Sequence, residues 1–236
     1  MIILRRFALV LALSFAWQAR AQDPKTLYPN MAPVDQYLAT DRNAEIGLAR
    51  SAAPLSISRD AEILVLGRSG YETAVKGQNG FVCLVERSWM TPDDDDPEFW
   101  NPKQRAPICY NPPSARTILP ITFRKTKLVL AGLSKAKIID GFKAPDQAKA
   151  PPLAAGAMSF MMSRQGYLSD AAGHAVPHLM FYLPRVDGAA WGADLPGSPV
   201  MLALQQVPGA AEPVTMFIIA VRKWSDGTPA MSGSAM

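Results

Sequence analysis

Histidine and cysteine are the residues that this chain has least of, with two of each among its 236 residues. The histidines, His174 and His178, do not form the H-E-x-x-H pattern of zinc-dependent hydrolases. The glycine patterns that bind phosphates or dinucleotides are also absent, as is the G-x-S-x-G turn of serine hydrolases. The sequence therefore contains no catalytic motif and does not by itself establish an activity.

Long apolar runs are scarce as well. Beyond the first residues, none reaches the roughly 18 residues that a membrane-spanning helix needs. The apolar segment 7–17 follows Arg5 and Arg6 and precedes a small-x-small pattern at residues 19–21, which is the order of a secretory signal peptide. We therefore expect cleavage before Gln22 and a periplasmic or secreted protein without a transmembrane segment.

Basic and acidic residues are nearly equal in number once the expected leader is removed. The sequence has 24 basic and 20 acidic residues, and the leader contains Arg5, Arg6 and Arg20. The remaining chain has 24 less 3, or 21, basic residues and a net charge of +1. Bulk charge gives no support to a nucleic-acid or membrane-surface partner, so we expect no nucleic acid among its partners.

The two cysteines, Cys83 and Cys109, predict one disulfide bond, because an even number of cysteines in an exported chain favours pairing. Two buried free thiols are the alternative. A catalytic cysteine is a third and weaker interpretation, because reactive thiols need a neighbouring group that lowers their pKa.

The clearest structural pattern covers residues 61–89. Three apolar or alternating runs are separated by two short turns, one flanked by Gly67 and Gly70 and the other by Gly77 and Gly80. Glycine adopts positive φ at little cost, as tight hairpin turns require. We therefore predict a meander of three antiparallel strands, each paired with the next.

Two helical regions are predicted. Asp35 is a candidate N-cap for a helix that ends before Pro54. Residues 114–142 have a helical composition, with a break at Pro120. The basic side of this second region is interpreted either as the solvated face of an amphipathic helix or as a surface for an acidic partner or anionic lipid.

Later apolar segments are typical of further strands, at residues 157–163, 178–183, 200–207 and 214–221. With the meander they predict a single α+β domain. Its sheet is expected to be mainly antiparallel, with five to six strands and with helices packed on one face. The expected organisation is a leader at 1–21, an extended lead-in at 22–34, one domain at 35–224 and a flexible tail at 225–236.

Residues 89–113 contain six prolines, a density that blocks both helices and strand ladders. We predict a long ordered loop there, held by the disulfide. Loops of this length are often functional, so its aromatic residues are candidate binding groups; they are Trp89, Phe99, Trp100 and Tyr110. The aspartates at 93–96 are either a cation site or a solvated loop tip, and they lack the spacing of an EF-hand loop.

A metal site is a further hypothesis. Residues four apart in an extended segment face the same way, so His174 and His178 can share a ligand. Asp170 or Asp187 would complete a set of two histidines and one carboxylate, which can activate water for hydrolysis. A stable site needs three or four convergent ligands, so we expect ordinary structural histidines and no cofactor.

Five phrases of the sequence resemble an uncharacterised group of exported bacterial proteins. They are EIGLARSAAP, GYETAVKGQNGFVCLVERSW, FWNPKQRAPICYNPP, GYLSDAAGHAVPHLMFYLP and WGADLPGSP. The likeness spans residues 45–229 and carries neither an activity nor site residues across. Together these observations favour a non-catalytic exported protein that binds a ligand or partner or associates with the envelope. The alternative is a metal-dependent hydrolase that uses His174 and His178.

Overall fold

The computed structural model describes residues 27–91, 96–143, 152–174, 176–203 and 214–230. Several predicted features lie outside these residues. They are the cleavage site before Gln22, three of the four clustered aspartates (93–95), the second half of the tail at 231–236, and the end of the strand predicted at 200–207.

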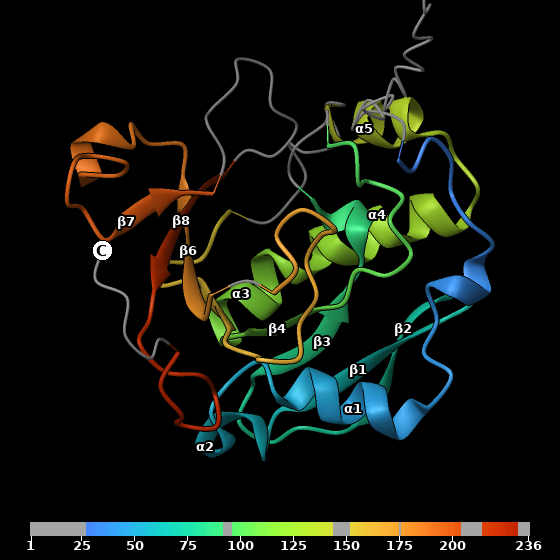
Figure 1. Ribbon diagram of the computed structural model, residues 1–236, viewed down its shortest axis with the longest axis horizontal. Coiled ribbons are helices and arrows are strands. Elements are labelled where there is room, and N and C mark those ends of the chain that lie inside the picture. Colours follow the sequence, from blue (N-terminus) through green and yellow to red (C-terminus); the bar gives the residue numbers. More distant parts are fainter. Residues whose placement is uncertain (1–26, 92–95, 144–151, 175, 204–213, 231–236) are drawn as a thin grey trace, which may run out of the picture.

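Eight strands of the described chain form one sheet, in the order β2-β1-β3-β4-β5-β6-β8-β7 (Figure 1). All neighbours are antiparallel except β1 and β3. The α+β class is confirmed, and the expected five to six strands were too few. The strands are β1 (Glu62–Gly67), β2 (Gly70–Val75), β3 (Val82–Glu86), β4 (Ala106–Tyr110), β5 (Met158–Met161), β6 (His178–Pro184), β7 (Val200–Leu202) and β8 (Val214–Ala220).

The predicted meander is only half right. β1 and β2 form a hairpin at Gly67 and Gly70, but β3 pairs with β1 in parallel rather than with β2. The interior of β1 is buried throughout, so its backbone N–H and C=O groups have no water to bond and need a strand on each edge. β2 instead exposes Glu72 and Thr73, as an edge strand does. The connection to β3 passes against the start of β1, where a Cβ on Gly77 would lie 2.2 Å from the Glu62 nitrogen.

Strand β4 lies inside the segment predicted to be a loop. It pairs with the whole of β3, and Pro107 sits opposite Val85. β5 pairs with β4 only at Cys109 and Tyr110, so the proline occupies a position where β4 has a single neighbour. Proline is tolerated at such edge positions, which is why its density did not exclude a strand here.

The predicted disulfide is confirmed. Cys83 on β3 and Cys109 on β4 are direct cross-strand partners, and both are fully buried. The bond closes a segment of 26 residues that includes the long loop. It therefore holds together the two central strands and the chain between them.

Replacing both cysteines by serine is expected to lower the free energy of unfolding by roughly 2–4 kcal/mol, since the unfolded chain gains freedom when the bond is lost. Denaturant unfolding of the oxidised protein and of the double variant measures the difference. Unreduced, denatured wild-type protein should also show no reactive thiol at Cys83 or Cys109. A loss well below 1 kcal/mol would contradict the expected contribution.

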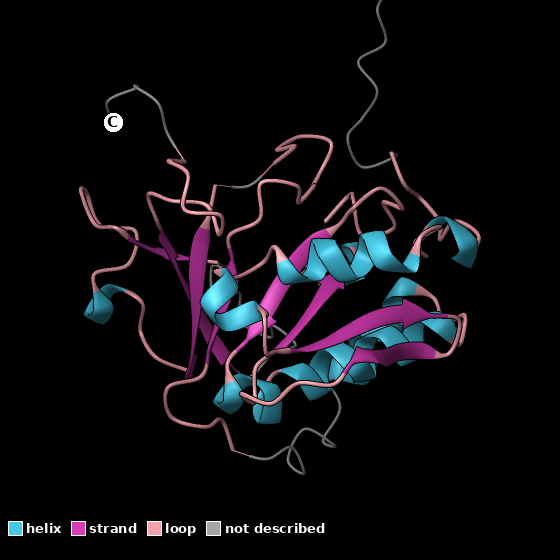
Figure 2. Cartoon of the chain, turned by 90° about the horizontal axis from the view of Figure 1, so that it is seen from below, coloured by secondary structure: helices cyan, strands magenta, loops and turns pink. Residues whose placement is uncertain are grey.

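Helices cover both faces of the sheet, which corrects the prediction that they lie on one face (Figure 2). Side chains alternate along each strand, so both faces of the central strands are apolar and both need a cover. One face packs against α1, and the other packs against α3 and α4. The helices are α1 (Arg42–Arg50), α2 (Leu55–Ser58), α3 (Pro112–Thr117), α4 (Leu119–Leu130) and α5 (Lys135–Lys143). None of these described helices has the length and apolar character of a membrane span.

The first helix begins at a local capping signal, but its N-cap is Asp41 and not the predicted Asp35. Asp35 lies in a short 3-10 helix, η2 (Val34–Gln36), and Asp41 is the cap of α1, with its carboxylate accepting from the Asn43 nitrogen at 2.8 Å. The predicted break near Pro120 is confirmed, because α3 ends at Thr117 and the proline stands in the first turn of α4.

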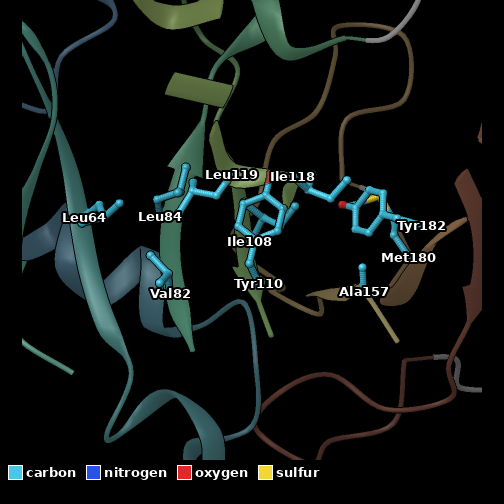
Figure 3. Close-up of a cluster of buried hydrophobic side chains, with 10 residues drawn as sticks. All are labelled: Leu64, Val82, Leu84, Ile108, Tyr110, Ile118, Leu119, Ala157, Met180 and Tyr182. Carbon is cyan, nitrogen blue, oxygen red and sulfur yellow. The ribbon is translucent and has the colours of Figure 1, made fainter. Parts of the chain in front are cut away.

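The core on the α3/α4 side spans most of the sheet. Figure 3 shows side chains from β1, β3, β4 and β6 arranged across this face, with Ile118 and Leu119 beside them.

Residues 225–230 were expected to begin a flexible tail. They form a hydrogen-bonded turn, in which the Trp224 nitrogen donates to the Thr228 carbonyl at 2.9 Å.

Candidate functional site

A cavity of about 260 Å³ lies on the sheet face that α3 and α4 cover. Its walls come from β4, β5, β6 and β8 on one side and from α4 and the segment after η3 (Ser88–Met90) on the other. Because these elements are far apart in the sequence, the cavity exists only where the curved sheet brings them together.

The wall formed by the sheet is apolar and rich in methionine. Met180 on β6 pairs with Ile218 on β8, and Met216 pairs with Tyr182, so these four side chains share one face. Met161 on β5 adds another thioether. Methionine side chains are flexible and polarizable, which makes such a wall adaptable to the shape of a bound molecule.

The polar end of the cavity is centred on Glu86, the last residue of β3. Val82, Leu84 and Glu86 alternate onto the same face, so a carboxylate occupies a position where the pattern calls for an apolar side chain. The Tyr110 hydroxyl donates to Glu86 Oε1 at 2.5 Å, and Thr122 Oγ1 donates to the same oxygen at 3.2 Å. Glu86 retains 9% of its exposure, and the two hydroxyl residues are more deeply buried.

The protonation state of Tyr110 follows from its surroundings. Burial raises the pKa of its phenol well above the usual value, and the negative charge of Glu86 raises it further. The phenol therefore stays neutral at physiological pH and acts as a hydrogen-bond donor to the carboxylate. This fixed donor holds Glu86 in one orientation toward the cavity.

Among the described residues that line the cavity, the charged ones are Glu86 and Asp96, and both are acidic. The Lys125 ammonium donates to the Thr91 carbonyl at 2.9 Å. Arg87 follows Glu86 in the chain but binds Glu45 in the core on the α1 side.

The aromatic binding candidates of the long loop are mostly core residues. Trp89 is fully buried, and its indole nitrogen donates to Thr126 Oγ1 at 3.1 Å. Phe99 and Trp100 pack edge to face with their ring centres 4.6 Å apart. Of the four candidates, Tyr110 is the one that lines the cavity containing Glu86.

A second cavity, of about 250 Å³, borders Phe99, Trp100, Tyr28 and Lys135. Its two core aromatics expose only 2% and 6% of their surface, so their rings are already used in packing. The Lys135 ammonium lies 5.0 Å from the Phe99 ring centre, a distance typical of a cation–π contact. This cavity therefore has less surface to offer a ligand than the first.

The two histidines are not brought together into a metal site in the described part of the chain. His178 is buried, its Nδ1 lies 2.8 Å from the Val176 carbonyl, and burial lowers its pKa. His174 Nδ1 contacts the Gly166 carbonyl instead. No group of three or more histidine, cysteine, aspartate or glutamate side chains converges among the described residues.

Asp170, the third metal candidate, is engaged by the protein itself. It accepts hydrogen bonds from the Tyr167 and Tyr28 hydroxyls and forms an ion pair with Lys103 at 3.1 Å. The hydrogen bond from Tyr167, followed by that from Tyr28, lowers the pKa of Asp170 to about 2. The carboxylate thus joins three separate segments of the chain, while Asp187 accepts from the nitrogen of Ala189 at 3.0 Å.

Glu86 and Thr122 are the site residues that sequence reasoning missed. A glutamate at the end of an apolar run commonly marks where a strand emerges into solvent, so Glu86 did not stand out. Thr122 lies in α4, and the sequence of this region indicated only a basic side and an apolar side. The only available signal was the alternation of Val82 and Leu84, which places Glu86 on the buried face once β3 is assigned.

Comparison of the chain with models of protein families, with curated proteins and with solved structures finds no match.

Proposed function

We propose that this protein is a non-catalytic, exported ligand-binding protein and that the cavity between the sheet and α4 is its binding site. The observation that carries the proposal is Glu86, a carboxylate at the end of a mainly apolar cavity, fixed there by Tyr110 and Thr122. Sites for small molecules generally combine an apolar wall with a few such oriented polar groups.

The size of the cavity limits the ligand. Its volume of about 260 Å³ lies just under the roughly 300–1,000 Å³ typical of pockets for drug-sized molecules. A small molecule, or one end of a larger one, therefore fits. The adaptable methionine wall supports a range of apolar shapes rather than a single rigid one.

Export is supported by the disulfide, which is compatible with an oxidising compartment. The predicted signal peptide supports the same location. The metal-dependent hydrolase is not favoured by any specific observation, because His174 and His178 each contact a different backbone carbonyl.

Binding in the cavity is tested with 1-hexanol as the probe, added to protein carrying ¹³C-labelled methionine methyl groups. We expect saturable changes in the NMR signals of Met180 and Met216, because both side chains line the cavity. Met158 lies on the same sheet but alternates to the opposite face from Met161, so its signal should stay unchanged.

A pair of matched variants locates the effect. Met216→Phe adds bulk inside the cavity, whereas Leu183→Phe adds bulk on the neighbouring strand at a position that alternates to the other face. The first is expected to weaken hexanol binding at least about tenfold, and the second to leave it unchanged. The proposal fails if no saturable change occurs, or if Met158 responds as strongly as Met180.

A further inference from the structure

We infer that His178, Met161 and Met180 form a binding site for a soft, monovalent metal ion of the copper(I) class. The three residues lie together on neighbouring strands, β5 and β6, and the two methionines also line the cavity. The inference goes beyond the proposed function, because it adds a metal ion and does not require an organic ligand in the cavity.

The register of β5 and β6 makes these three residues neighbours. Met161 is the direct cross-strand partner of His178, and Ser159, two residues earlier on β5, is the partner of Met180. Directly opposed residues have Cβ atoms about 4.5–5.5 Å apart, and diagonal neighbours such as Met161 and Met180 lie about 7–8 Å apart. Opposed and alternate residues also share one face of a sheet, so one imidazole and two thioethers start from a small triangle of backbone.

The imidazole of His178 is held in the form that binds metals. Its Nδ1 lies 2.8 Å from the Val176 carbonyl, which can only accept, so Nδ1 carries the hydrogen and Nε2 keeps its lone pair. His178 makes no other side-chain hydrogen bond in the described part of the chain. Histidines that bind metals commonly donate their second ring nitrogen to a backbone carbonyl in this way, which fixes the tautomer and the ring orientation.

Burial supports the same form of the ring. His178 retains 6% of its exposure, and burial lowers its pKa below the usual value, so the ring is neutral at physiological pH. The opposite side of His178 faces Ala220 on β8, a small residue that is exposed. An ion therefore has a short route from solvent to this end of β6.

The donor set selects the class of metal. Thioether sulfur is a soft ligand that favours copper(I), and imidazole also suits copper. All three donors are uncharged, and no group of three or more histidine, cysteine, aspartate or glutamate side chains converges among the described residues. A divalent ion would thus lose its hydration without gaining a negative ligand, whereas a monovalent ion loses less. This set shares only His178 with the histidine and carboxylate set predicted from the sequence.

The inference is tested with Ag⁺, a soft monovalent ion that needs no reductant, so the disulfide stays intact during the titration. Silver nitrate is added in chloride-free buffer to protein with ¹³C-labelled methionine methyl groups. We expect the signals of Met161 and Met180 to change and to saturate at one equivalent. Met158 alternates to the opposite face of β5, and Met201 on β7 is 37% exposed, so neither should respond to the first equivalent.

Paired variants locate the ligands. His178→Gln and Met161→Leu are each expected to weaken Ag⁺ binding at least about tenfold, a loss that even changes in the outer shell of metal sites cause. The matched controls are His174→Gln, which replaces the other histidine, and Met158→Leu, which replaces the methionine of β5 on the opposite face. Both controls should bind Ag⁺ as the wild type does, and equal losses in the test and control variants would overturn the site.

The wild type and Met161→Leu decide the matter even where His178→Gln fails to fold. An equal response of Met158 or Met201 to the first equivalent, or unchanged affinity in Met161→Leu, would contradict the inference. Protein that binds 1-hexanol but not Ag⁺ would overturn this inference alone. Protein that binds Ag⁺ but not 1-hexanol would support the metal site and overturn only the proposed function.

Discussion

Replacing Glu45 by alanine is expected to lower the free energy of unfolding by about 3–5 kcal/mol, because the variant leaves the charge of Arg87 buried without a counter-ion. Arg87 Nη2 lies 2.9 Å from both oxygens of Glu45, and the side chains of Glu45 and Arg87 are 2% and 0% exposed. Arg87 also donates to the Tyr37 carbonyl at 2.7 Å, so the pair connects α1 with the residue that follows β3 and the residue that follows η2. Denaturant unfolding measures the loss.

An exposed ion pair provides the control for this first prediction. Arg42 and Glu72 lie 2.5 Å apart, but their side chains are 50% and 59% exposed. Glu72→Ala should therefore cost only about 0–1 kcal/mol, as solvent-screened pairs do. Similar losses for Glu45→Ala and Glu72→Ala would show that burial is not what gives the Arg87 pair its effect.

The second large effect is expected at Trp89. Trp89→Ala should lower the free energy of unfolding by roughly 3–5 kcal/mol, since it removes a fully buried aromatic side chain and leaves a cavity. The ring packs against Tyr37 with centres 5.0 Å apart, and its nitrogen donates to Thr126. Calorimetry or denaturant unfolding of the variant measures the change.

Substitutions of Trp89 also test whether this residue acts in core packing or in ligand binding. Trp89→Phe keeps most of the apolar contact, so it should lose clearly less stability than Trp89→Ala. Hexanol binding in Trp89→Phe should match the wild type, because Trp89 does not line the cavity that contains Glu86. A stable Trp89→Ala variant with weakened binding would restore the hypothesis that this residue contacts the ligand.

Short-range patterns predicted the parts of the fold that depend on neighbours in the chain. The glycine pair around Arg68 and Ser69 marks the β1–β2 hairpin, and Pro120 marks the break before α4. Strand propensity and period located β5, β6 and β8 close to their observed bounds. Each of these features depends on a few consecutive residues, so the sequence holds the necessary information locally.

Pairings between distant segments could not be predicted in the same way. The strand pattern of residues 62–86 suits both a meander and the observed order in which β1 lies between β2 and β3. Which order forms depends on burial: β1 requires neighbours on both edges, and β2 does not. The strand β4 was missed for a related reason, because Pro107 is acceptable only at a position without a second neighbour.

Sequence patterns were enough to predict the α+β class and to favour a disulfide between Cys83 and Cys109, and they contain no recognised catalytic motif. The tertiary structure alone decided what the polar residues do. Glu86, Tyr110 and Thr122 come from β3, β4 and α4, and their hydrogen bonds form only when these elements pack. A buried carboxylate becomes a candidate site through its surroundings, and those surroundings are set by contacts between residues far apart in the chain.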